Sequence, residues 1–269
     1  MLAIFISFLF FVYFFSDYLG LTKDKDEKYG IFAASLIFSV ALNGLISMML
    51  VASQKVYLPI YLIQIICFFM VVKIKKIKVV LWDFFGGFLS DISSIRKNYD
   101  QKFITFIYLI LILLFFASFG PINHSDTVNY YVGYPFQFYL RNSHFVDGDL
   151  GQGLLGIGDF ANITFIQEKS IWLIRVSQYL PLIPILIFLF KRKTSPLFIL
   201  IFISSPIFLQ WLTVGKINFV GDSCLSLIYL CWKFKPSQRY ALTTILVGLI
   251  SISIKISSVL IFIPILFDI

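Results

Sequence analysis

Asp126 is the side chain whose setting best suits chemistry, in the segment Pro121-Ile-Asn-His-Ser-Asp-Thr-Val-Asn-Tyr-Tyr131. A carboxylate among aromatic side chains can act as a general base toward a hydroxyl group, because burial raises its pKa toward the useful range. His124, Tyr130 and Tyr131 are close enough in sequence to contact the same substrate. The alternative roles are ordinary ones: Asp126 caps the helix that follows, and His124 is a surface histidine.

A second acidic group consists of Asp147 and Asp149, in a stretch that continues with several glycines. Carboxylates at this spacing in a glycine-rich turn can bind a divalent cation through oxygen ligands, which makes them weak candidates for a metal site. The spacing fits no EF-hand loop, and the glycines do not follow a strand as a phosphate-binding loop requires. A solvated turn is the simpler interpretation, and the sequence indicates no cofactor.

A third group of polar side chains lies inside or beside apolar segments, and it comprises Lys216, Asn218, Asp222 and Lys255. Ionisable side chains at membrane depth are costly, so they are candidates for a site that lines a polar cavity, with Asp222 and Lys255 as candidate partners. The alternative for both lysines is that they extend to the membrane interface. We expect Lys216 to do so, whereas for Lys255 both interpretations stay open.

The composition decides what kind of protein must position these residues. The 269 residues are 59% hydrophobic, 19% aromatic and only 13% charged, with a mean hydropathy of +0.91. Soluble domains carry about 25% charged residues, so this chain has too few charged residues to form a protein surface exposed to water on all sides. The sequence therefore predicts an integral membrane protein and argues against a soluble enzyme or a nucleic-acid-binding protein. The cysteines lie in apolar segments without metal-ligand spacing, and we expect them to be packing residues.

Hydrophobic runs of the length that crosses a bilayer predict an all-α polytopic transmembrane helical bundle with about eight or nine spans. A helix covering all of 240–267 would exceed the bilayer thickness and place Lys255 at its centre. We therefore expect a break between Ser253 and Ser257. The predicted spans are 1–21, 31–53, 56–72, 103–119, 171–190, 195–215, 217–232 and the two parts of 240–267.

Basic residues predict the orientation. Sixteen of the 22 lysines and arginines lie in the segments 22–30, 73–102, 191–193 and 233–239, which must share the cytoplasmic side. The N-terminus and the loop 120–170 are then outside, and we expect this loop to contain short amphipathic helices. The apolar segment 79–92 is too short to span and should lie at the cytoplasmic surface or under the bundle. Two regions result: an N-terminal region, 1–102, and a membrane region with the outer loop, 103–269.

Three segments resemble the bacterial integral-membrane glycosyltransferases of the GT-C fold, a group related to protein O-mannosyltransferases and aminoarabinose transferases. They are HSDTVNYYVGYPFQFYLRNS at 124–143, Ser205–Asp222 and Gly248–Leu260, within a matching region of about 103–267. The resemblance implies inverting transfer of a sugar from a polyprenyl-phosphate donor to a glycan or lipid acceptor on the outer face of a bacterial inner membrane. It assigns the catalytic role to Asp126, contact with the lipid phosphate to Lys255, and further substrate contacts to His124, Tyr130, Tyr131 and Asp222.

This chain departs from the usual family pattern at both ends of the matching region. Extra spans precede it, and the later spans and outer domain of full-length members do not follow, so we expect a fragment or a reduced relative. Two other functions stay open. A transporter or flippase of lipid-linked substrates would use the broken segment near Lys255. A non-catalytic subunit of a polysaccharide assembly complex would fit the short chain.

Overall fold

The computed structural model describes residues 2–19, 27–71, 74–119, 132–141, 155–177, 179–205 and 218–269. The regular elements in these ranges are helices, and no strand occurs among them, which confirms the all-α prediction. The α-helices are α1 (Leu2–Leu19), α2 (Glu27–Ala52), α3 (Ile60–Val71), α4 (Ile74–Asn98), α5 (Gln101–Ser118), α6 (Tyr134–Arg141), α8 (Ile157–Gln167), α9 (Leu173–Ser177), α10 (Tyr179–Lys191), α11 (Pro196–Ser204), α13 (Asn218–Phe234), α14 (Gln238–Ile254) and α15 (Val259–Asp268).

Two of the described helices, α1 and α2, are long and apolar enough to cross a membrane, and they point to membrane localisation. The other apolar helical stretches, among them Gln101–Ala117 in α5, α10 and α14, are 10–17 residues long. The predicted spans near 171–190 and 195–215 fall on α9 with α10 and on α11, with residues 178 and 206–217 outside the described part. The total of eight or nine spans stays a prediction.

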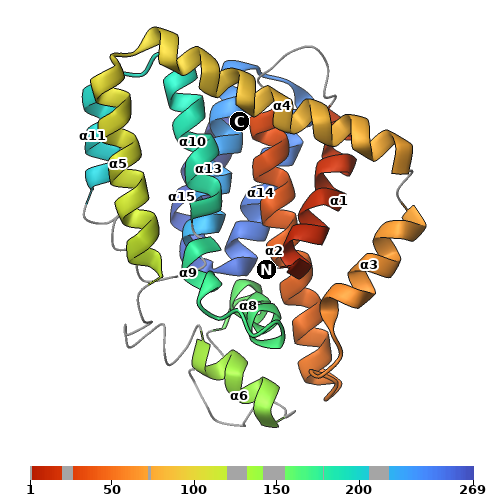
Figure 1. Cartoon of the computed structure of the whole chain (residues 1–269). Helices are drawn as coiled ribbons and strands as arrows, with labels where there is room; N and C mark the ends of the chain where they lie inside the picture. The colour runs from red at the N-terminus through yellow and green to blue at the C-terminus, as the bar shows by residue number, and fades with distance from the viewer. Residues whose placement is uncertain are drawn as a thin grey trace.

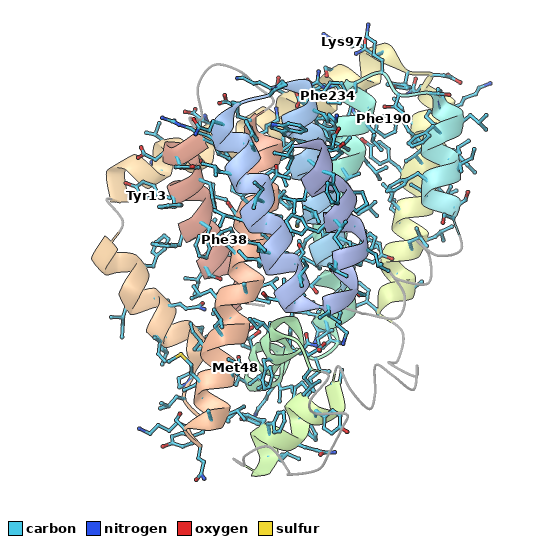
Figure 2. All side chains as sticks on the ribbon, turned by 180° about the vertical axis from the view of Figure 1, so that it is seen from behind. Tyr13, Phe38, Met48, Lys97, Phe190 and Phe234 are labelled. Carbon is cyan, nitrogen blue, oxygen red and sulfur yellow. The ribbon has the colours of Figure 1, made fainter. Side chains whose placement is uncertain are left out.

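The long helices stand side by side between two differently built ends (Figure 1). We call these the α4 end, where α4 lies across the bundle, and the α8 end, where α8 and α6 lie. In the view from behind, Lys97 marks the α4 end, Phe190 and Phe234 lie just below it, and Met48 lies beside α8 (Figure 2). The segment expected to rest on the surface, 79–92, is thus the middle of one 25-residue helix that crosses the bundle end.

Helix α2 lies at the centre of the bundle and contacts α1, α8, α13 and α14. Its buried residues include many alanines, serines and glycines, and such small side chains let neighbouring helices approach closely. The Asn43 amide group donates a hydrogen bond to the Ser7 hydroxyl on α1 at 2.9 Å and accepts one from Gln64 on α3 at 2.9 Å. Hydrogen bonds of this kind contribute about 0.6 kcal/mol each between membrane helices. This network joins α1, α2 and α3.

Ion pairs join the helix termini at the α4 end. The Asp91 carboxylate of α4 lies 2.5 Å from the Lys28 ammonium at the start of α2 and 3.4 Å from that of Lys191 at the end of α10. Lys235, just after α13, pairs with Glu27 at 2.8 Å. Because each pair joins segments far apart in the sequence, these contacts bring the termini of α2, α10 and α13 together under α4.

Candidate functional site at the α8 end

The site is built at the start of α8, where this helix packs against α2 and α14. Gly156 is the N-cap residue of this helix, and its N–H donates a hydrogen bond of 2.9 Å to Asp159 Oδ2. A carboxylate in the first turn satisfies one of the N–H groups that a helix start leaves without a partner. Asp159 is fully buried, with 0% of its surface exposed. The cap thus places a carboxylate inside the protein.

Two glycines let α8 pack directly against the bundle backbone. A Cβ atom on Gly44 of α2 would lie 2.0 Å from the carbonyl oxygen of Ile157, and one on Gly156 would lie 2.0 Å from that of Ile254. Both neighbours are backbone atoms, which cannot rotate away as the end of a side chain can. The start of α8 is therefore wedged between the middle of α2 and the end of α14, and this position brings Asp159 to the end of α14.

The predicted break in the last apolar stretch is confirmed at Lys255. Helix α14 ends at Ile254, Lys255 is extended with φ −156° and ψ 127°, and a short 3₁₀ helix, η2 (Ile256–Ser258), leads into α15. The Ser251 and Ser253 hydroxyls donate to the carbonyl oxygens of Val247 and Leu249 within α14. Hydrogen bonds from serine hydroxyls to these carbonyl oxygens compete with the backbone hydrogen bonds of the helix, which favours the end of α14 at this point.

Lys255 lies next to the buried carboxylate of α8. Its ammonium nitrogen is 3.5 Å from Asp159 Oδ2, with side-chain exposures of 20% for Lys255 and 0% for Asp159. Burial raises the pKa of the Asp159 carboxyl above its ordinary value, while the Lys255 ammonium and the Gly156 N–H oppose part of that rise. The lysine side chain is thus partly accessible and is held in place by a carboxylate that water does not reach.

Asp222 forms the third part of the site, one turn into α13. It is 6% exposed, and its Oδ1 atom has no hydrogen-bond partner within the described part of the chain. The buried Ser258 hydroxyl of η2 faces this carboxyl without reaching hydrogen-bond geometry. The Ser251 hydroxyl of α14 donates to the Gly221 carbonyl at 3.2 Å. The start of α13 therefore packs against the same break that carries Lys255.

The structure places only part of the predicted site. Asp222 and Lys255, expected as partners, both lie near the break between α14 and α15, but the ion pair of Lys255 in the structure is with Asp159. Six other predicted site residues lie outside the described residues: His124, Asp126, Tyr130, Tyr131, Asp147 and Asp149. The loop 120–170 contains a short helix, α6, which buries Phe138 and exposes Leu140, while the placement of this loop outside stays a prediction. Cys224 and Cys231 are buried, as expected of packing residues. Within the described ranges, no three His, Cys, Asp or Glu side chains are grouped so that they could hold a metal ion.

Sequence reasoning assigned no role to Asp159. The available signal was an acidic residue three positions after Gly156, which is typical of a helix start. That pattern predicts a cap, but it does not predict burial or a lysine partner from another helix. The same helix contains the N-glycosylation acceptor sequence Asn162-Ile-Thr164, whose asparagine and threonine are 0% and 1% exposed.

Comparison of the chain with protein-family models, with curated proteins and with solved structures finds no match.

Proposed function

We propose that this chain is a membrane-embedded glycosyltransferase of the GT-C kind, which transfers a sugar from a polyprenyl-phosphate donor to an envelope acceptor on the outer face. The single observation that carries the proposal is the partly exposed lysine at the helix break, which the buried Asp159 holds in place at 3.5 Å. A fixed cation at the end of an apolar helix bundle suits the phosphate of a lipid carrier.

The distribution of charge supports the topology that this function needs. The helix termini that meet under α4 are rich in basic residues, including Lys28, Lys191 and Lys235, and basic residues favour the cytoplasmic side. With the α4 end inside, the α8 end and the Lys255 site are outside, in a bacterial inner membrane with the N-terminus outside. The shorter apolar helices then complete a bundle of eight or nine spans, assisted by tilt and by contact with neighbouring helices.

The chemical step is a displacement at the sugar C1 atom with inversion. Asp126 accepts the proton of the acceptor hydroxyl group, the new bond forms between that oxygen and C1, and the bond between C1 and the phosphate oxygen breaks. The lipid phosphate leaves with the bonding electrons, and Lys255 stabilises its charge. Asp159 keeps the ammonium oriented, while His124, Tyr130, Tyr131 and Asp222 contact the sugars.

The test is transfer by the full chain in proteoliposomes. The substrate is polyprenyl phosphate carrying a tritiated hexose, the acceptor is an envelope glycan extract, and released polyprenyl phosphate is measured by mass spectrometry. We expect Asp126→Asn to lose transfer by at least 100-fold, the lower range for a general base, and Lys255→Gln to weaken it strongly. Asp83→Asn, on the exposed surface of α4, is the matched control and should retain activity. Equal activity of all variants would contradict the proposal.

A second function, movement of a lipid-linked substrate across the membrane, is favoured by the broken segment itself. Interrupted helices with buried ionisable residues are common in transporter sites, and here the break brings Lys255 close to Asp159. The same proteoliposomes separate the two functions. A transporter would change the leaflet in which the labelled lipid is accessible and would leave the bond between sugar and phosphate intact.

A further inference from the structure

Helix α4 is anchored to the bundle by one face. Phe84 and Ile95 are buried on this face, and Asp91 between them is 4% exposed. Besides its two lysine partners, Asp91 accepts a hydrogen bond of 2.6 Å from the Tyr29 hydroxyl. A buried carboxylate with these partners fixes the rotation of α4 about its own axis. The directions of the other faces follow from it.

A second face of α4 is apolar and exposed. Residues spaced three or four apart lie on one side of a helix, and one such row reads Lys78, Trp82, Phe85, Leu89, Ile92 and Arg96. Within this stripe Trp82 is 80% exposed, Leu89 68% and Phe85 44%. An exposed apolar stripe with a tryptophan is typical of a helix that lies in the interface of a membrane.

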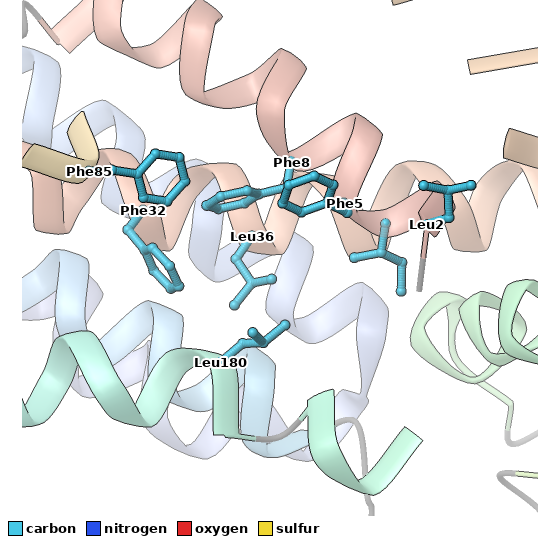
Figure 3. A pocket seen from close by; sticks show the side chains of 8 residues that line it. Leu2, Phe5, Phe8, Phe32, Leu36, Phe85 and Leu180 are labelled. Carbon is cyan, nitrogen blue, oxygen red and sulfur yellow. The ribbon is translucent and has the colours of Figure 1, made fainter. Parts of the chain in front are cut away.

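Phe85 shows which way the stripe faces. Its ring lines an apolar crevice of about 450 Å³ together with Phe5 and Phe8 of α1, Phe32 and Leu36 of α2, and Leu180 of α10 (Figure 3). The crevice also contacts Leu2 and Ile4, and every one of its lining residues is hydrocarbon or aromatic. Among the described helices, α1 and α2 are long and apolar enough to cross a membrane, so the stripe faces the side on which lipid chains would contact the bundle.

The charges on α4 match an anionic partner. Lys78 and Arg96 stand at the two ends of the stripe, and both are exposed. They are five helical turns apart and therefore on the same side. The exposed polar residues Asp83, Ser90 and Lys97 lie on a third face, turned by about 100–140° from the line through Lys78 and Arg96. The apolar stripe thus carries an exposed cation at each end.

We infer that the stripe on α4 is a binding surface for an anionic glycerophospholipid. One acyl chain occupies the crevice beside Phe85, Trp82 and Leu89 lie among neighbouring chains, and Lys78 and Arg96 contact the phosphate groups. This inference needs α1 and α2 to cross the bilayer, as proposed above, but it does not depend on the transferase chemistry. A failure of the glycosyl transfer assay therefore leaves it standing.

The test uses the full chain in nanodiscs of phosphatidylcholine, with and without phosphatidylglycerol. We expect phosphatidylglycerol to raise the Tm of the wild-type chain, and we expect the Lys78→Gln/Arg96→Gln variant to lose most of that rise. Lys97→Gln is the matched control, since it removes one positive charge next to Arg96 but on the other face. It should keep the rise.

A second measurement covers the case in which the double variant folds poorly. Brominated phosphatidylcholine quenches tryptophans that contact lipid chains, and the difference between the wild-type chain and Trp82→Phe isolates Trp82. We expect strong quenching of this difference signal. The inference is overturned if Trp82 is not quenched, if phosphatidylglycerol does not raise the Tm of the wild type, or if Lys97→Gln loses the rise as fully as the double variant does.

Discussion

Replacing Gly44 by alanine tests the contact that places α8 and hence the candidate site. The added Cβ atom would lie 2.0 Å from the Ile157 carbonyl oxygen and 2.5 Å from a side-chain carbon of the same residue. Overpacking in a tight interior costs about 1–3 kcal/mol, and a backbone neighbour favours the upper end of this range. Alanine also gains about 1 kcal/mol over glycine inside a helix. The net loss is therefore about 2 kcal/mol.

Gly86 offers the matched control, because it lies in the middle of α4 and a Cβ atom there would meet nothing within 4 Å. Gly86→Ala should keep only the gain in helix propensity, about 1 kcal/mol. At roughly 2–4 °C per kcal/mol for a domain of this size, Gly44→Ala should lower Tm by about 4–8 °C and Gly86→Ala should raise it by about 2–4 °C.

The assay is thermal unfolding of the purified chain in one detergent, followed by intrinsic fluorescence. Size-exclusion chromatography should first show that both variants are monodisperse, so that the Tm values compare folded protein. The reasoning is refuted if Gly44→Ala is as stable as the wild type or more stable, while Gly86→Ala behaves as expected. Such a result would mean that α8 does not pack on the middle of α2.

Three further predictions concern the α8 end and the cysteines. Lys255→Met leaves the buried Asp159 carboxylate without this cation and should lower the free energy of unfolding by about 3 kcal/mol, the lower value for a broken buried pair. Adding Asp159→Asn should recover most of the lost Tm. An unchanged Tm in the single variant would argue against the pair. Because the pKa of Asp159 is raised in the folded chain, its protonation favours the fold, and this contribution is lost as pH rises through the folded pKa. The Tm of Asp159→Asn relative to the wild type should therefore be highest at neutral pH and fall on acidification toward about pH 4, and a difference independent of pH would be inconsistent with a raised pKa. Cys224 and Cys231, at 1% and 5% exposure, should react with a maleimide only after denaturation, as mass spectrometry can show; rapid labelling of the folded chain would contradict their burial.

Local patterns predicted the helices and the break at Lys255. Long apolar runs indicated α1 and α2, and the excess length of the apolar stretch 240–267, with a lysine at its centre, indicated the end of α14. The same reasoning recognised 79–92 as a surface segment but missed its extension to one helix from Ile74 to Asn98. The flanking lysines and arginines lower the hydropathy at both ends, although these residues are good helix formers.

Hydropathy and the spacing of charges were sufficient for the helical class, for the membrane-crossing length of α1 and α2, and for the interruption near Lys255. Hydropathy and charge spacing depend only on residues that are close in the sequence, so they are the same in any conformation of the chain. The partner of Lys255 is 96 residues away, and Gly44 and Gly156 meet backbone from distant helices. Such pairings depend on how closely whole helices approach one another, so tertiary packing alone decided that Asp159 is buried beside Lys255 and which way the stripe on α4 faces.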